Sequence, residues 1–246
     1  MNGLYLAASG AASQLTALDV TTNNLVNAGV PGYRRFIQVM WAVSGNGSPY
    51  QFAEVGPATQ IDLKQGPLYA TGNPLDIAIS GPAFIAVQTP NGPAYTRNGQ
   101  LERTPDGELL AAGQPVLREA GGPAAAASVG GETITLPAGI ISIGGDGSIS
   151  VNGLSIAKIQ LGDATGVEMV PAGAGLYKPR DSNPLPPPSA LTNIVRQGFL
   201  EGSTGSAIHG MVGMTSIMRN YEGVMRAVQA IDDNQNRAIQ AFTLSA

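Results

Sequence analysis

Apolar residues repeat every three or four positions at both ends of the chain, and the long middle lacks this pattern. Near the N-terminus the repeat runs in steps of 4,3,4,3,4,3 through Leu4, Ala8, Ala11, Leu15, Leu18, Thr22 and Leu25. Near the C-terminus it runs through Met211, Met214, Met218, Tyr221, Met225 and Val228, beside a second row at Ile217, Val224, Ile231 and Ala238. A repeat that averages three and a half residues predicts helices that pack against other helices.

The two predicted helices run from residue 1 to about 28 and from about 205 to about 242. We expect the first to end at Gly29, as a left-handed cap, and at Pro31, which cannot continue the hydrogen-bond ladder. Gly3 and Gly10 lower the helix propensity of this segment, and even favourable helices of this length are marginal in water. Both ends are therefore expected to order only when they pack against neighbours.

The middle of the chain alternates with a period of two residues, which is typical of half-buried strands. Leu75, Ile77 and Ile79 alternate with Asp76, Ala78 and Ser80. Turn dipeptides, which supply positive φ in tight hairpins, occur at Asn91-Gly92, Asn98-Gly99, Asp106-Gly107, Asp146-Gly147 and Asn152-Gly153. The predicted fold class is α+β, with the N- and C-terminal helices paired as a coiled coil and an antiparallel β-domain inserted between them.

This pattern predicts four regions. Residues 1–30 and 200–246 form a discontinuous helical assembly domain, residues 31–74 an extended connector with some β structure, residues 75–180 the β-domain, and residues 181–199 a proline-rich return strap. Loops are expected at residues 44–49 and 121–131. Pro184 to Pro188 should be an extended, polyproline-like segment.

Composition narrows the function classes. The chain of 246 residues has 33 Gly and 18 Pro, only 12% charged residues and a net charge of −4, so it offers no basic surface for nucleic acid. It has no cysteine, which excludes disulfides and thiolate metal sites. No segment approaches the roughly 18 to 20 apolar residues of a membrane span, and the N-terminus does not match a cleaved secretory signal. A surface so poor in charge is suited to being covered.

Candidate chemistry is sparse. His209 is the single histidine, and one histidine without a second one or a thiolate does not make a usual zinc site. Carboxylates of the β-region occur at Asp62, Asp76, Glu102, Asp106, Glu108, Asp146 and Asp163. Their spacing does not favour a catalytic pair: Asp106 and Asp146 belong to turns, and Asp76 is expected on the polar side of a strand. We expect no enzyme activity, no cofactor, no metal and no small-molecule substrate.

Three segments resemble the flagellar axial proteins, the family of bacterial rod and hook subunits. Residues 22–35, TNNLVNAGVPGYRR, are similar to that family's N-terminal signature, which is carried here by Asn23, Asn24, Leu25, Asn27, Pro31, Gly32 and Tyr33. Residues 66–117 resemble the core of the family's β-domain, and residues 198–234 its C-terminal helix. The chain departs from the family pattern at Gly81-Pro82-Ala83-Phe84 and at Ser203-Thr204-Gly205.

The resemblance implies export through the flagellar type III apparatus, assembly in the periplasm with other rod subunits, and transmission of torque by a helical rod. Residues 71–76, 211–214 and 232–234 favour a subunit of the proximal rod, and a distal-rod subunit is the alternative. Assembly would be carried by an apolar set that we call the predicted seam: Leu4, Leu15, Leu18, Leu25, Met211, Met214, Met218, Tyr221, Met225 and Val228.

Two other functions are compatible with a β-domain on a helical stem. The first is a periplasmic module that binds cell-wall glycan, although a single tryptophan, Trp41, and few other aromatic residues provide little surface for stacking on sugars. The second is a hydrolase that acts through carboxylates, for which the sequence contains no motif. The thioether row of the C-terminal helix would also suit an adaptable ligand surface, but its helical spacing favours a contact between helices.

Overall fold

The computed structural model describes residues 2–43, 54–119, 132–188 and 194–244. One long helix, α1 (Asn2–Val26), comes before a region of short strands in the sequence, and another, α2 (Ala207–Leu244), comes after it. Every strand pairing from β3 onward whose register is described is antiparallel. The chain divides into a helical unit, formed by residues 1–26, 36–59 and 206–246, and a β-rich unit, formed by residues 27–35 and 60–205. The structure is α+β, as the sequence predicts.

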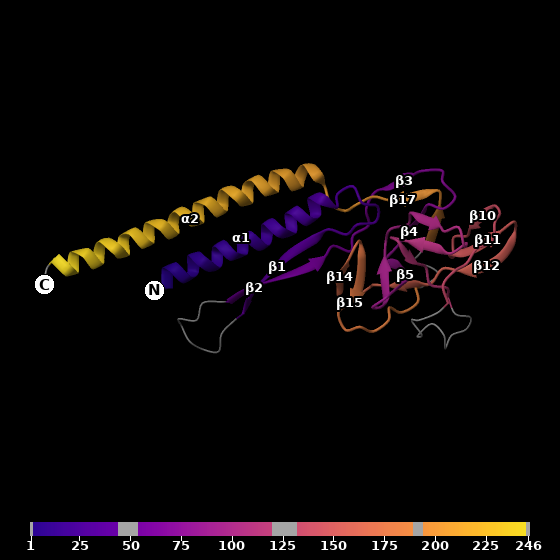
Figure 1. Cartoon of the computed structure of the whole chain (residues 1–246), viewed down its shortest axis with the longest axis horizontal. Coiled ribbons are helices and arrows are strands. Elements are labelled where there is room, and N and C mark those ends of the chain that lie inside the picture. Colours follow the sequence, from indigo (N-terminus) through magenta and orange to yellow (C-terminus); the bar gives the residue numbers. More distant parts are fainter. Residues whose placement is uncertain (1, 44–53, 120–131, 189–193, 245–246) are drawn as a thin grey trace. The chain divides into compact units, whose positions relative to one another are not determined.

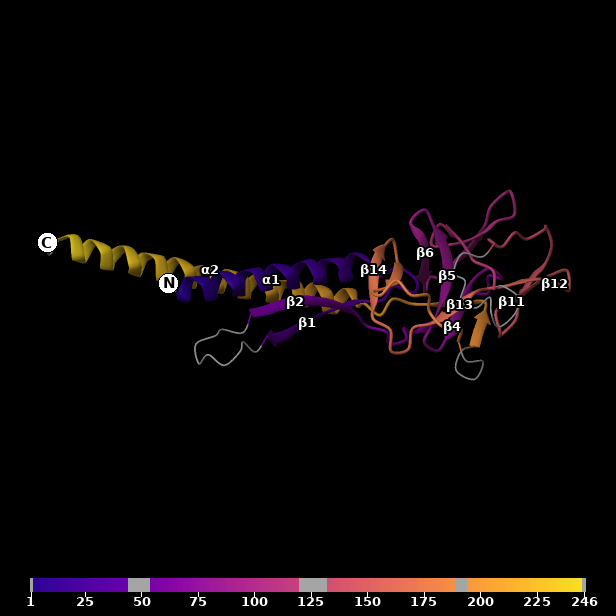
Figure 2. The ribbon, with the colours of Figure 1, turned by 90° about the horizontal axis from the view of Figure 1, so that it is seen from below.

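In the helical unit, α1 and α2 contact each other. Figures 1 and 2 show the two helices side by side in both views, with both termini at the same end of the unit, so the helices are antiparallel. Their contact is close at two glycines: a Cβ atom placed on Gly210 would lie 3.5 Å from the Cβ of Leu25, and one placed on Gly213 would lie 3.8 Å from Cγ2 of Thr21. Strand β1 (Phe36–Val43) also contacts α1 and pairs with β2 (Glu54–Ile61).

The end of α1 differs from the prediction. The helix ends at Val26, and Gly29 is not among the residues with positive φ, so the expected left-handed cap at Gly29 is wrong. The side chain of Asn24 holds the segment that follows the helix instead. Its Nδ2 donates to the Phe36 carbonyl at 2.9 Å, and its Oδ1 accepts from the Phe36 amide at 2.7 Å.

The start of α2 agrees with the prediction to within two residues. Ser206 precedes the helix, and its Oγ accepts a hydrogen bond of 3.4 Å from the amide of His209, as expected of a residue that caps a helix N-terminus. His209 itself is exposed, and its Nδ1 lies 3.0 Å from the same Oγ.

The β-rich unit contains several small antiparallel sheets. Its largest sheet has the strand order β13-β5-β6-β15-β14, and smaller sheets have the orders β10-β11-β12, β7-β8-β9, β16-β4 and β17-β3. The strands are β3 (Leu68–Ala70), β4 (Ile77–Ser80), β5 (Ala83–Thr89), β6 (Gly92–Thr96), β7 (Leu101–Arg103), β8 (Leu109–Ala111), β9 (Gln114–Pro115), β10 (Ile141–Ile143), β11 (Ser148–Val151), β12 (Leu154–Lys158), β13 (Leu161–Asp163), β14 (Met169–Gly173), β15 (Leu176–Pro179), β16 (Ile194–Gln197) and β17 (Phe199–Glu201). The last two strands return to pair with the first two, which closes the unit on itself.

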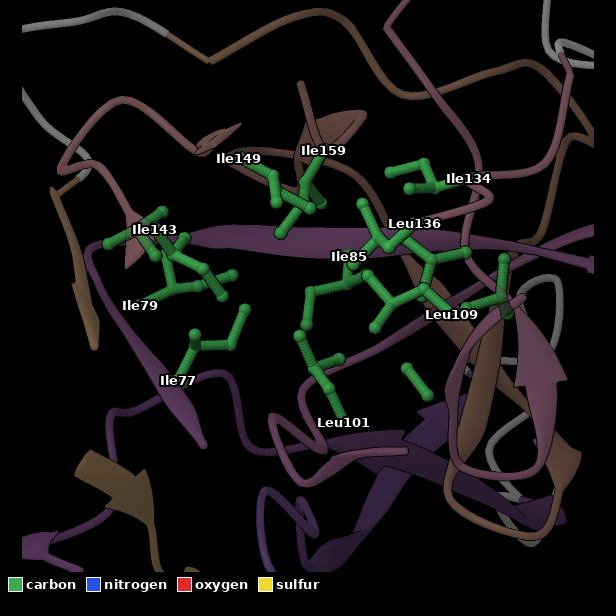
Figure 3. Close-up of a cluster of buried hydrophobic side chains, with 14 of the residues drawn as sticks. Ile77, Ile79, Ile85, Leu101, Leu109, Ile134, Leu136, Ile143, Ile149 and Ile159 are labelled. Atoms are coloured by element: carbon green, nitrogen blue, oxygen red, sulfur yellow. The ribbon is translucent and has the colours of Figure 1, made fainter. Parts of the chain in front are cut away.

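Aliphatic side chains from most of these strands meet in one core (Figure 3). Its labelled members are Ile77, Ile79, Ile85, Leu101, Leu109, Ile134, Leu136, Ile143, Ile149 and Ile159. The alternation expected around residue 77 is only partly correct, because Asp76, Ala78 and Ile79 are all buried. The Asp76 carboxylate is satisfied there by the Asn73 amide, whose Nδ2 donates to Oδ1 at 3.0 Å.

The turn dipeptides behave as predicted with one exception. Positive φ occurs at Gly92, Gly107, Gly147 and Gly153. Gly99 has no positive φ, and glycine is needed there for another reason: a Cβ atom would lie 1.7 Å from the carbonyl oxygen of Ile77. In this case the dipeptide marks a close approach of two backbones rather than a hairpin turn.

The proline-rich strap packs against the β-rich unit. Leu185 is buried, its amide donates to the Tyr95 hydroxyl at 2.9 Å, and the Asp163 amide donates to the Pro186 carbonyl at 2.8 Å. The loops predicted at residues 44–49 and 121–131 lie outside the described residues. The β-rich unit is wider than the expected range of 75–180, since it also contains residues 27–35 and reaches Gly205.

Candidate assembly surface

The side of α2 that faces α1 follows a repeat of three and a half residues. Its half-buried positions are Gly210, Gly213, Met214, Ile217, Tyr221, Val224, Met225, Val228 and Ile231, which we call the inner row. On α1, the corresponding half-buried positions include Ala11, Gln14, Leu18, Thr21 and Leu25. The antiparallel contacts of Gly210 with Leu25 and of Gly213 with Thr21 belong to these rows. The second apolar row noted in the sequence, at Ile217, Val224 and Ile231, therefore belongs to the inner row.

The predicted seam divides between this inner contact and solvent. Half-buried members are Leu18, Leu25, Met214, Tyr221, Met225 and Val228, and exposed members are Leu15, Met211 and Met218. The side chain of Leu4 is not among those described. Met211 is 60% exposed and Met218 51% exposed, so these large apolar side chains remain free to contact another molecule. Ile208, Val212 and Val26 are exposed as well.

The residues of the N-terminal signature lie at the end of α1 and in the segment that follows it. Asn23 and Leu25 are in the last turns of the helix, Asn24 bonds to Phe36, and Asn27 and Pro31 belong to the following turns. Gly32 and Tyr33 are buried in the β-rich unit.

Gly32 is required by its surroundings. Its φ is +68°, and a Cβ atom would lie 2.1 Å from the carbonyl oxygen of Arg97. Its amide donates to the Glu201 carbonyl at 2.8 Å. The segment that leaves α1 is therefore held directly against the segment that leads to α2, because Glu201 lies five residues before Ser206.

A buried ion cluster lies at the same place, formed by Arg34, Arg97 and Glu201, and we call it the Glu201 cluster. Nη1 of Arg34 lies 2.7 Å from Oε1 of Glu201, and Nη1 of Arg97 lies 3.2 Å from Oε2. The side chains of Arg34, Arg97 and Glu201 are 0%, 1% and 1% exposed. Replacing one partner of a buried ion pair leaves an unpaired charge in the interior, so we expect loss of any one of these three charges to destabilise the fold.

Backbone groups add hydrogen bonds to the Glu201 cluster. The Gly66 amide donates to Oε1 of Glu201 at 2.7 Å, Arg34 donates to the Lys64 carbonyl, and Arg97 donates to the carbonyls of Ile79 and Gly81. The guanidinium carbon of Arg97 also lies 5.0 Å from the centre of the Phe84 ring, within range of a cation–π contact. Glu201 thus joins segments that are far apart in the sequence.

Ionisation around the Glu201 cluster reflects burial. Burial lowers the pKa of Arg97 to about 10, although the Glu201 carboxylate opposes this shift, and the positive charge of Arg34 adds to it. Burial likewise raises the pKa of Tyr33 to about 12; Tyr177 adds to this shift and a hydrogen bond with Asn27 opposes it. For Asp62, burial alone would raise the pKa of the carboxyl, but hydrogen bonds from the Lys64 amide and the Arg35 guanidinium bring it below its usual value.

Sequence reasoning recognised Arg34 and Glu201 only as parts of family motifs, and it did not single out Arg97. In a chain with 12% charged residues, a lone glutamate after Phe199 and Leu200, at the end of an apolar strand, is a signal of a buried charge. The sequence does not reveal its partners, because Arg34 and Arg97 are 167 and 104 positions away.

The described residues contain no group of three or more potential metal ligands, and no helix among them is long and apolar enough to cross a membrane. The candidate carboxylates have local structural partners in several cases. Ser148 donates to Asp146, Thr165 donates to Asp163, and Arg35 pairs with Asp62 at 2.9 Å. The prominent feature of the molecule is a pair of helices with exposed apolar positions.

Family models match three parts of the chain. Residues 4–34 match the model of the flagella basal body rod protein, residues 78–151 that of the flagellar hook protein FlgE/F/G D1 domain, and residues 196–241 that of the flagellar basal body rod FlgEFG protein C-terminal region. These are the parts of the molecule that contain α1, the core strands and α2. The resemblance to flagellar axial proteins is confirmed.

Full-length relatives agree with these matches. The chain is 32% identical to the flagellar basal-body rod protein FlgF of Escherichia coli K12 over 99% of both chains, and 31% identical to FlgF of Rhizobium meliloti over 98% of this chain and 97% of the relative. It is 27% identical to the rod protein FlgG of Buchnera aphidicola, over 93% and 95% of the two chains. Family members are structural subunits of the flagellar basal body and assemble with other axial subunits. The chain belongs to the family of flagellar basal-body rod proteins and is FlgF-like.

Proposed function

We propose that this chain is a structural subunit of the proximal rod and that its terminal helices pair as a coiled coil whose exposed side joins neighbouring axial subunits. The observation that carries the proposal is the exposure of the side chains in the helical unit. None of the described side chains in this unit is buried. This exposure is unusual for a helix such as α1, in which Asp19 is the only charged residue among 25. A helix so poor in charge and so exposed in the single chain is suited to being covered in an assembly.

The inner row supports the coiled-coil part of the proposal. Positions 210, 214, 217, 221, 224, 228 and 231 follow steps of 4,3,4,3,4,3, which is the spacing of a seam between supercoiled helices. Gly210 and Gly213 allow the two backbones to approach closely at one end of the pair. Larger residues such as Ile217 and Tyr221 continue the row along α2.

The exposed apolar residues support contacts with other subunits. Leu15, Met211 and Met218 lie on helix surfaces that the partner helix of the same chain does not cover. Heterologous contacts of this kind build open helical assemblies when the rotation between subunits does not close a ring. A rod built in this way, with each subunit held at several sides, would transmit torque.

Family membership, rather than a site in this chain, is the support for the proposed export through the flagellar type III apparatus and assembly in the periplasm. The place in the proximal rod is supported by the FlgF relatives, which are more similar to this chain than the FlgG relatives are. Basal bodies from cells that lack the distal-rod subunit should still contain this chain, and its loss from them would favour the distal rod.

The central test is Leu18→Glu, in cells whose own copy is deleted. Leu18 is half-buried on the inner side of α1, so a carboxylate there would be buried without a partner at a cost of several kcal/mol. We expect the variant to be absent from isolated basal bodies and the cells not to swim, while circular dichroism of the purified protein shows an intact β-rich unit. The matched control is Asn220→Glu, which adds the same charge at an exposed polar position of α2. Normal incorporation of Leu18→Glu would contradict the proposal.

A further inference from the structure

Both helices carry a second, exposed row with coiled-coil spacing. On α1 the exposed positions in steps of 4,3,4,3,4 are Ala8, Ala12, Leu15, Asp19, Thr22 and Val26, which we call the outer α1 row. On α2 the exposed positions in the same steps are Ile208, Val212, Thr215, Arg219, Glu222 and Arg226, which we call the outer α2 row. The two rows match in spacing. The outer α1 row has one charged position, Asp19, and the outer α2 row has three, Arg219, Glu222 and Arg226.

The charges of these rows are complementary. Asp19 is the only charged residue of α1, and it makes no ion pair within the described part of the chain. On the outer α2 row, Arg226 pairs with Glu222 of the same helix at 3.8 Å. Arg219 makes no ion pair among the described residues, so it is the unpaired cation at the centre of this row.

Asp19 and Arg219 do not meet within one chain. The two helices of a chain contact each other through Leu25 and Thr21 on one side and Gly210 and Gly213 on the other, which lie on the inner rows. The outer rows are exposed and lie on other faces of their helices. A contact between Asp19 and Arg219 therefore requires two molecules.

We propose that the outer α1 row of one copy of this chain packs against the outer α2 row of a second copy, with Asp19 facing Arg219. The inference rests on the proposed function, because it names the partner of the exposed helix surfaces. An exposed ion pair contributes little, but a pair that is covered by surrounding apolar residues sets register and selects the partner. Leu15 belongs to the outer α1 row, and Met218 precedes Arg219 in the sequence; both side chains are exposed and supply apolar area around the pair.

The test is charge reversal in the full chain, with incorporation into basal bodies and swimming as readouts. Asp19→Arg and Arg219→Asp should each lower incorporation by about tenfold, because like charges then face each other in a covered contact. The double variant should restore incorporation. Co-expression of the two single variants should also restore it, since a contact between copies is repaired in trans by alternating subunits. Asp19→Arg combined with Arg226→Asp is the control and should stay defective.

Each other outcome has a definite meaning. Normal incorporation of both single variants, or single defects that neither the double variant nor co-expression restores, would overturn the pairing of Asp19 with Arg219. Rescue by the double variant without rescue by co-expression would overturn the contact between copies, because the pair would then lie within one chain. Rescue of Asp19→Arg only by a reversed charge in another rod subunit would overturn the assignment to a second copy. None of these results affects the proposed rod function, which falls only if Leu18→Glu also incorporates normally.

Discussion

The helical unit and the β-rich unit of this chain are stabilised in different ways. All described side chains that are fully buried lie in the β-rich unit, where they form a continuous aliphatic core and the Glu201 cluster. In the helical unit the inner-row side chains are only half-buried and several large apolar side chains are exposed. One chain thus combines a region with a buried core of its own and a region that we propose is completed by neighbouring subunits.

The largest expected effect concerns the Glu201 cluster. Glu201→Gln leaves the guanidinium groups of Arg34 and Arg97 buried without a carboxylate, and we expect it to lower the free energy of unfolding of the β-rich unit by about 3 to 5 kcal/mol. Urea unfolding followed by circular dichroism measures this. Glu168→Gln is the matched control, because Glu168 pairs with Arg180 at the surface and its loss should cost less than about 1 kcal/mol. Equal effects of the two changes would show that the cluster has no special role.

Truncating one side chain in each unit compares how much packing stabilises the β-rich unit and the helical unit. Ile85→Ala removes a fully buried side chain and should lower the free energy of unfolding by about 2 to 5 kcal/mol. Leu18→Ala removes a half-buried side chain of the helical unit, and in the monomer we expect a loss of less than about 1 kcal/mol. Both are read from unfolding curves of the monomer. A loss at Leu18 as large as that at Ile85 would mean that the helices are already packed as a core before assembly.

A smaller effect separates two glycines that the sequence does not distinguish. Gly32→Ala forces a Cβ atom into the Arg97 carbonyl at a positive φ, and should lower the free energy of unfolding by about 1 to 3 kcal/mol. Gly29→Ala has open space around the new Cβ atom and no positive φ, so it should be neutral or slightly stabilising. Thermal unfolding of the two variants decides the order. The reverse order would restore the left-handed cap at Gly29 that the sequence suggested.

The smallest effect is the dependence of stability on pH. The pKa of Asp62 is lower in the folded chain than its usual value, so its contribution is fully present above about pH 4 and is lost as the pH falls through the folded-state pKa. Asp62→Asn should therefore make the free energy of unfolding of the β-rich unit fall less steeply as the pH is lowered. Near pH 7 the dependence of this free energy on pH should be little changed. Unfolding curves recorded from about pH 2 to about pH 7 provide the measurement. An unchanged acid profile would contradict the shift at Asp62.

Periodicity in the sequence was sufficient to predict both helices, because apolar spacing is a local signal. The turn glycines were predicted for the same reason. Local signals could not tell which apolar row faces the partner helix, since Met218 and Ile217 are both apolar and differ only in their burial against α1. The predicted seam was therefore a mixture of inner and outer positions.

Long-range contacts explain the other differences. The burial of Asp76 depends on Asn73 and on the Gly198 amide, which donates to the Asp76 carbonyl at 2.7 Å from a distant strand pair. The Glu201 cluster likewise depends on arginines far away in the sequence. Neither arrangement is encoded in spacing, and both become visible only when the strands before and after the core are brought together.

Hydrogen exchange of the purified monomer, compared with the chain in isolated basal bodies, tests the division between the two units most directly. We predict that amides of α1 and α2 exchange rapidly in the monomer and slowly in the basal body, while amides of the core strands, such as that of Ile85, are protected in both. Helix amides that are as protected in the monomer as those of the core strands would contradict the division, because the helical unit would then be complete without neighbours.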